Sequence, residues 1–123
     1  MKYAALLLVF ALAACGGGAL TPATIQAALS SAGASNYSET KAPNAVPQSY
    51  IGHAKFVLAD KSGQYFLCDT KRNCDAIFAY FDAFKALAGP YTYQSGSGLV
   101  VVQLNSELTP AQAAPIEQAT KNL

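Results

Sequence analysis

The chain has 123 residues, of which 52% are hydrophobic and 12% are charged, and its formal net charge is +1. This length fits one small domain, and the low charged fraction excludes an intrinsically disordered chain. Eight basic residues against seven acidic residues leave no basic face of the kind that binds nucleic acid, so nucleic acid is not an expected partner.

The first segment of the chain has the pattern of an export signal. Lys2 precedes an apolar run that ends in Leu12-Ala13-Ala14-Cys15. One positive charge, an apolar core and small residues form the plan of a signal peptide. The run is shorter than the roughly 20 apolar residues that a membrane-spanning helix needs. Leu12 to Cys15 resemble the lipobox of bacterial lipoproteins, whereas the alternative is an ordinary secretory signal in which Cys15 is incidental.

The lipobox resemblance implies a cleaved signal peptide over 1–14 and lipid modification of Cys15. The mature chain then begins at Cys15 with a diacylglyceryl group and an amide-linked acyl chain such as palmitate, followed by a glycine tether over 15–19. Two or more acyl chains hold a protein stably in a membrane. Gly16 stands where enteric-type lipoproteins retained in the inner membrane carry aspartate. We therefore expect the outer membrane, or the outer face of the cytoplasmic membrane in a host without one.

The mature domain is expected to open with a short helix. Thr21 is placed as an N-cap and Pro22 at the first helical position, which predicts a helix to about Ser31 that ends at Gly33. The following segment, 34–50, mixes small and polar residues with two prolines and shows neither a helical nor a strand period. It is predicted to be a long, loosely ordered linker.

A first hairpin is predicted after this linker. Residues 52–59 alternate between two faces, with Ala54, Phe56 and Leu58 on one of them, as in a half-buried strand. Residues 60–63 are turn formers, and 64–69 resume an extended pattern. The two strands should therefore pair with each other.

Cys68 and Cys74 are the two cysteines that remain after Cys15. An even pair in an exported chain predicts a disulfide, which would join a strand end to a helix start. The alternatives are a thiol redox pair, a metal site and two unpaired thiols. The spacing is not C-x-x-C, and the sequence offers no second pair of soft metal ligands. The disulfide is therefore the prediction.

A central helix is predicted over 71–88, because its apolar residues recur at helical spacing and Gly89-Pro90 follow. Charged residues lie outside the apolar stripe, so the stripe should pack on a sheet. The stripe consists of Ile77, Tyr80, Phe81, Phe84, Leu87 and Ala88.

A second hairpin and a last helix complete the chain. Residues 91–94 and 99–104 are predicted strands around a Ser-Gly turn, and the second strand is apolar enough to be central. Thr109 and Gln112 form a capping-box pattern at the start of the last helix. Pro115 lies beyond the first turn of this helix, so a kink or a late restart is expected there.

These elements predict one α+β domain over 20–123 in the order α-ββ-α-ββ-α. Two hairpins give a four-stranded antiparallel sheet, and the helices are expected to pack on one face of it. The tetrapeptide Leu-Thr-Pro-Ala opens the helices at Leu20 and Leu108. Duplication of one structural unit is an alternative explanation of this repeated tetrapeptide, although helix starts favour Thr-Pro in any case.

The sequence contains little that indicates catalysis. His53 is the only histidine, and a proton-transfer role would need a carboxylate brought to it by the tertiary fold. The chain has neither the G-x-S-x-G motif nor a metal-binding motif, so no catalytic residue, metal or cofactor is predicted. An enzyme or enzyme accessory using His53, and a redox protein using Cys68 and Cys74, stay as alternatives.

Tyrosines are the remaining functional signal. Tyr91 and Tyr93 share a strand face beside a Ser-Gly turn, and Tyr37 and Tyr50 bracket the predicted linker. Tyrosine, serine, glycine and asparagine are typical of adaptable contact surfaces. We therefore predict a lipid-anchored, non-catalytic envelope protein that binds a protein or an envelope polymer through these four tyrosines; the alternative is that Tyr91 and Tyr93 pack on the sheet.

Overall fold

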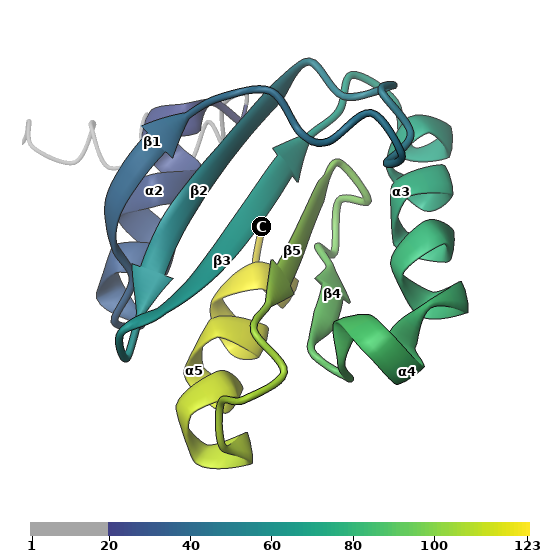
Figure 1. Cartoon of the computed structure of the whole chain (residues 1–123). Helices are drawn as coiled ribbons and strands as arrows, with labels where there is room; N and C mark the ends of the chain where they lie inside the picture. Colours follow the sequence, from purple (N-terminus) through teal and green to yellow (C-terminus); the bar gives the residue numbers. More distant parts are fainter. Residues whose placement is uncertain (1–19) are drawn as a thin grey trace, which may run out of the picture.

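The computed structural model describes residues 20–123 (Figure 1). They form one α+β unit with a five-stranded antiparallel sheet in the order β1-β2-β3-β5-β4. The predicted signal peptide, Cys15 and the tether lie outside the described residues. The elements are α2 (Pro22–Ser31), β1 (Ser35–Glu39), β2 (Gly52–Leu58), β3 (Lys61–Leu67), α3 (Lys71–Ala83), α4 (Lys85–Ala88), β4 (Thr92–Gln94), β5 (Val100–Leu104) and α5 (Pro110–Lys121).

Strand β1 corrects the prediction of a loosely ordered linker over 34–50. Ser35–Glu39 pairs antiparallel with β2, so the sheet has five strands and not four. The strand is polar and mostly exposed, and its pairing shifts register near Asn36, whose φ is +55°. Such a strand has no alternating apolar face, which is why its sequence shows no period of two.

The β2–β3 hairpin is tighter than predicted. Leu58 pairs with Lys61, so the turn consists of Ala59 and Asp60 alone, and both have positive φ values, of 50° and 65°. Two left-handed residues match the twist of a two-residue hairpin, which favours Asn-Gly or Asp-Gly but here contains Ala-Asp. The predicted turn residues Lys61 to Gly63 are therefore part of β3.

The sheet is covered on both faces, which corrects the expectation of helices on one face only. α2 and α5 bury one face, through Ile25, Leu29 and Ile116 against Phe56 and Val102. α3 and the segment after β1 cover part of the other face around Phe66 and Val101. In Figure 1, α2 lies beside β1 and β2, whereas α3 lies at the β4 side. The sheet is thus the middle layer of the domain.

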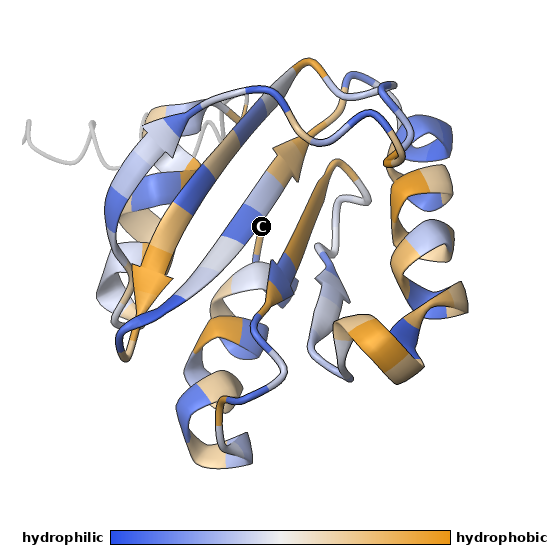
Figure 2. Cartoon of the chain, viewed as in Figure 1, coloured by the Kyte–Doolittle hydropathy of each residue, from blue (hydrophilic) through white to orange (hydrophobic). Residues whose placement is uncertain are grey.

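The hydropathy of β5 reflects its burial on both faces of the sheet. In Figure 2, β2 alternates between hydrophilic and hydrophobic residues in its first half, and β3 is hydrophilic at its start and hydrophobic at its end, whereas β5 is hydrophobic over most of its length. Val100 and Val102 face α2 and α5, and Val101 faces α3. A strand that is buried on both faces loses the alternation.

The predicted helix over 71–88 is divided at Phe84, which is the C-cap of α3 and stands directly before α4. Ala88 of α4 still packs against the core around Phe66, and its carbonyl accepts from Gln103 Nε2 of β5 at 3.2 Å. Other residues of the apolar stripe are exposed beyond Ala83. Phe84 is 48% exposed and Leu87 is 84% exposed.

Helix α5 runs through Pro115 as one element, so the predicted restart is absent. Proline removes one hydrogen bond, which the rest of the helix compensates. Thr109 and Gln112 form the predicted capping box, and Ala113, Ile116 and Thr120 are buried. Thr21 forms a second capping box at the start of α2, as its N-cap pattern predicts.

Candidate functional site

A cavity of about 400 Å³ runs along strand β4, at one edge of the sheet. Phe78 of α3 forms one wall, and Glu117 and Lys121 of α5 form the other. Pro90 and the three residues of β4 line the strand side. We call this cavity the β4 edge slot.

The backbone of β4 leaves hydrogen-bonding groups free in this slot. The Leu104 amide donates to the Tyr91 carbonyl at 2.8 Å, and the Ser95 amide donates to the Val100 carbonyl at 2.9 Å. Because alternate residues of a strand point their N–H and C=O groups in opposite directions, Thr92 and Gln94 point theirs away from β5. Within residues 20–123 no backbone partner meets these two amides and two carbonyls.

The side chain of Thr92 adds an unpaired polar atom. Its Oγ1 is buried and forms no hydrogen bond within residues 20–123. A buried hydroxyl without a partner costs about 1–3 kcal/mol, so such atoms are rare in folded proteins. Thr92 faces the same side of the sheet as α3, in register with Gln103.

Tyr93 faces the other side of β4, toward α5. Its side chain is 8% exposed and packs in the core beside Val102. Burial raises the pKa of Tyr93 to about 12, with smaller contributions from the nearby Glu117 carboxylate and from Tyr91. The phenol is therefore a packed, neutral group at the floor of the slot.

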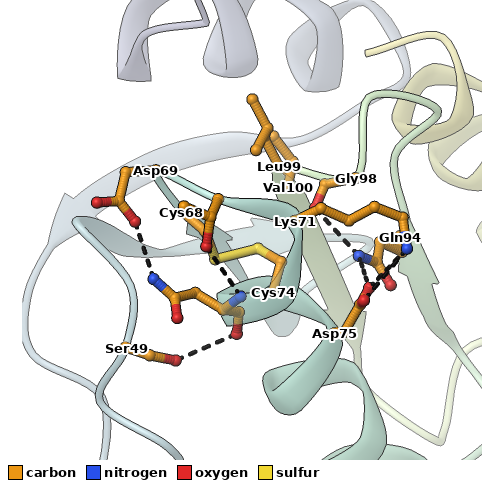
Figure 3. Close-up of a disulfide and its surroundings, with 12 residues drawn as sticks. Ser49, Cys68, Asp69, Lys71, Cys74, Asp75, Gln94, Gly98, Leu99 and Val100 are labelled. Atoms are coloured by element: carbon orange, nitrogen blue, oxygen red, sulfur yellow. Dashed lines mark hydrogen bonds and ion pairs between the residues drawn. A yellow bond between two sulfur atoms is a disulfide. The ribbon is translucent and has the colours of Figure 1, made fainter.

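The disulfide fixes α3 beside the slot. Cys68 and Cys74 are bonded, with their Cα atoms 5.7 Å apart, as the sequence predicts (Figure 3). The bond joins the end of β3 to the first turn of α3, and Phe78 lies one turn further along that helix. Both cysteines are almost fully buried. This position favours a structural role over a redox role, because reactive thiols are partly exposed.

Gln94 ties β4 to the same corner. Its Nε2 donates to Asp75 Oδ1 at 2.8 Å and to the Gly98 carbonyl at 3.0 Å (Figure 3). Lys71 Nζ pairs with the same carboxylate at 3.1 Å. These two contacts, that with Gln94 first, lower the pKa of the Asp75 carboxyl. The strand and the helix are thus joined by polar contacts above the slot.

The four predicted tyrosines do not form one surface. Tyr37 packs with the core on the α2 and α5 face, and its hydroxyl donates to the Gln26 carbonyl at 3.0 Å. Tyr50 packs on the opposite face beside Phe66, and its hydroxyl accepts from the Ala42 amide at 2.9 Å. The Tyr91 hydroxyl donates to the Leu108 carbonyl at 3.0 Å. Three of the four hydroxyls therefore serve the fold, and Tyr93 alone lines the slot.

His53 is buried in the sheet and not placed in a catalytic cleft. It is 5% exposed, its Nδ1 lies 2.7 Å from the Thr40 carbonyl and its Nε2 lies 2.8 Å from Gln64 Oε1. A carbonyl oxygen only accepts, so Nδ1 donates to Thr40. Within residues 20–123 neither partner is a carboxylate, so the geometry lacks the acid–base pair that an enzyme using His53 requires.

A second, smaller cavity lies over the polar part of the α3-side face. It measures about 240 Å³ and is lined by Lys55, Gln64 and Gln103, which are in register across three strands. Gln64 Nε2 donates to Gln103 Oε1 at 2.9 Å, and Gln103 Nε2 donates to the Leu104 carbonyl at 2.8 Å. These two amides bond to each other and to the Leu104 carbonyl, so they are not free to bind a partner.

The β4 edge slot was not predicted, although two features of the sequence indicate the edge strand that lines it. The prediction of a second hairpin places a strand at 91–94, and Pro90 before it is typical of an edge strand. Phe78, Glu117 and Lys121 come from helices whose placement depends on the tertiary fold. No sequence pattern links these residues to Thr92.

Within residues 20–123, no helix combines the length and apolar character needed to cross a bilayer. The same part of the chain holds no cluster of three histidine, cysteine or acidic side chains suited to a metal ion. Comparison with protein-family models, with curated proteins and with solved structures finds no match for this chain.

Proposed function

We propose that this protein is exported, anchored to a bacterial envelope membrane by lipid on Cys15, and acts there as a non-catalytic binding module. The observation that carries the proposal is the Leu12-Ala13-Ala14-Cys15 pattern after a short apolar run. The outer membrane is the proposed location in a host that has one. In other hosts it is the outer face of the cytoplasmic membrane.

The disulfide supports export. Disulfides persist in oxidising compartments and are rare in the cytosol of most organisms. Cys68 and Cys74 pair with each other and leave Cys15 as the one further cysteine of the sequence. This division of the three cysteines agrees with a lipid-modified residue and a structural bridge.

The binding role is supported by what the described residues offer. His53 is engaged with an amide and a carbonyl, whereas the β4 edge slot presents free backbone groups of Thr92 and Gln94. Free backbone groups of this kind bind a partner through hydrogen bonds and do not require a catalytic step. Binding at the slot is therefore better supported than catalysis at His53.

Metabolic labelling tests the anchor. Bacteria that express the full chain are fed an alkyne-tagged palmitate analogue, and the purified protein is analysed for label and for the mass of its N-terminus. We expect label on the wild type and on the C68S/C74S double variant, which keeps Cys15, and none on Cys15→Ser. An unlabelled wild type, or label that persists in Cys15→Ser, would contradict the anchor.

A further inference from the structure

We propose that the β4 edge slot binds an extended segment of another protein, which pairs with β4 as a sixth strand of the sheet. The inference names the partner class of the binding module under Proposed function and so rests on its binding part. It does not depend on the lipid anchor, because the slot lies wholly within residues 20–123.

The free backbone groups determine the geometry of the partner. The two amides and two carbonyls of Thr92 and Gln94 point out of the sheet along one line. Residues two apart in a strand are separated by about 7 Å, which is also the spacing of matching groups in an incoming strand. A strand is therefore the backbone conformation that satisfies all four groups at once.

The walls of the slot indicate the side chains of the partner. In an added strand, successive side chains point to opposite faces of the sheet. One set would meet Phe78, which is apolar, and the other set would meet the paired Glu117 and Lys121, whose charged groups are 3.5 Å apart. A segment that alternates apolar and polar residues matches both walls.

The position of the slot favours a single extended chain over a second copy of this protein. α3 and α5 both contact β4, one from each face of the sheet. Two β4 edges flanked in this way would bring four helices together before the strands paired. A lone peptide strand is narrow enough to avoid this clash.

The opposite edge of the sheet contrasts with β4. The pairing of β1 with β2 is interrupted by a register shift at Asn36, whose φ is +55°. Bulges on edge strands disturb the regular row of groups that a partner strand needs. The chain therefore protects the β1 edge with an irregularity, whereas β4 keeps a regular ladder with β5.

Two substitutions at one position separate edge pairing from other kinds of binding. Thr92→Pro removes the outward N–H and places the proline ring on the edge, whereas the ladder to β5 does not use that N–H. Thr92→Val keeps the N–H and the shape of the side chain but removes the hydroxyl. Both variants are compared only after urea unfolding has shown that they are folded.

The test uses the full chain with Cys15→Ser, so that lipid does not interfere. A phage-displayed library of random dodecapeptides is selected on this protein, and the enriched peptides are synthesised and titrated by fluorescence anisotropy. Each peptide is also made with N-methyl groups at alternate residues, which block hydrogen bonding along one edge of the peptide. The amide signals of Thr92 and Gln94 are followed by NMR during each titration.

We expect enriched peptides that alternate apolar and polar residues and that shift the Thr92 and Gln94 signals. Thr92→Pro should weaken their binding about tenfold or more, as expected for a loss near 1.4 kcal/mol, and one N-methyl pattern should do the same. Thr92→Val should bind within about threefold of the unsubstituted protein, since no backbone group is lost.

Four outcomes would overturn the inference. Failure to enrich any peptide, or equal binding to Thr92→Pro, would exclude strand addition at β4. Concentration-dependent dimerisation that Thr92→Pro abolishes would assign the edge to a second copy instead. Peptide binding that appears only when residues 1–19 are removed would assign the slot to the chain's own N-terminal segment. Loss of palmitate label with peptide binding intact would contradict the anchor alone.

Discussion

Thr92 combines a buried, unpaired hydroxyl with an outward backbone amide in the β4 edge slot. In the free protein the hydroxyl lowers the free energy of unfolding, because burial removes its water contacts without supplying a hydrogen-bond partner. This argument gives a prediction for the stability of the free protein.

Thr92→Val should stabilise the free protein by about 1 kcal/mol, because it replaces an unpaired buried hydroxyl by a methyl group of similar size. The matched control is Thr120→Val in α5, where the hydroxyl is also buried but donates to the Ile116 carbonyl at 2.7 Å. That control should be neutral or destabilising. Urea unfolding of both variants measures the difference, and stabilisation of neither or of both would contradict the prediction.

Gly63 is a second residue whose role depends on its neighbours. A Cβ atom at this position would lie 2.6 Å from Phe56 Cε1 and 3.2 Å from Leu104 Cδ2. The alanine variant should therefore be destabilised by about 1–3 kcal/mol, as expected for overpacking of a core. Gly52 is the control, because its Cβ would meet Leu67 Cβ at an ordinary 3.6 Å. Equal unfolding midpoints for Gly63→Ala and Gly52→Ala would refute the clash.

Tyr93 should make the fold sensitive to high pH. Burial raises its pKa from 10.0 to about 12. Between these values the folded chain keeps a proton that the unfolded chain has lost, so the free energy of unfolding falls as the pH rises through this window. Below pH 10 the contribution is complete.

Tyr93→Phe should reduce this alkaline slope, and at neutral pH it should cost little because the aromatic ring keeps its packing in the core beside Val102. Part of the slope should remain, since burial also raises the pKa of Tyr37 and Tyr65. Unfolding midpoints in urea from pH 8 to 12 measure the effect. An unchanged slope in the variant would show that Tyr93 does not titrate in this window.

At the scale of elements, the disulfide determines where α3 begins. Cys68 follows β3 and Cys74 lies in the first turn of α3, so the bond fixes the angle at which the helix leaves the sheet. Thr70 also caps this helix by accepting from the Asn73 amide at 3.2 Å. Covalent and hydrogen bonds thus act on the same turn.

Reduction of the disulfide should lower the free energy of unfolding by about 2 kcal/mol, the value that loop closure gives for so short a ring. The C68A/C74A double variant provides the control, because reductant should leave its unfolding midpoint unchanged. Urea unfolding of the Cys15→Ser chain with and without a phosphine reductant makes the comparison. Equal midpoints for the oxidised and reduced protein would contradict a stabilising role.

Elements with a regular pattern could be predicted, and elements without one could not. α2, β2 and α5 have caps or a clear alternation, and each is found near its predicted bounds. β1 is polar and bulged, so its strand conformation depends on pairing with β2. The predicted helix over 71–88 is interrupted at Phe84, and the apolar period continues through this break, so the period does not mark it.

At the scale of the whole molecule, cover on both faces should make the inner strands the most protected. β3 and β5 are paired on both sides and buried between two layers, whereas β1 is an exposed edge. Amide hydrogen exchange should therefore be slowest in β3 and β5 and fast in β1. Protection in β1 equal to that in β5 would contradict this arrangement.

The candidate site shows the same division between local and long-range information. The sequence determined the cysteine pairing and the strand beside the Ser-Gly turn, because both depend on residues close together in the chain. It could not bring Phe78 and Glu117 to opposite sides of β4, since these residues are far apart in the sequence and their contacts require the assembled sheet.

The sequence by itself therefore determined the α+β class, most helix starts, the first hairpin and the disulfide. Caps, alternation and cysteine count act over a few residues, so they can be read locally. Only the tertiary structure decided the fifth strand, the cover on both faces and the β4 edge slot. These features arise from which surfaces meet, and burial between distant segments leaves no local period in the chain.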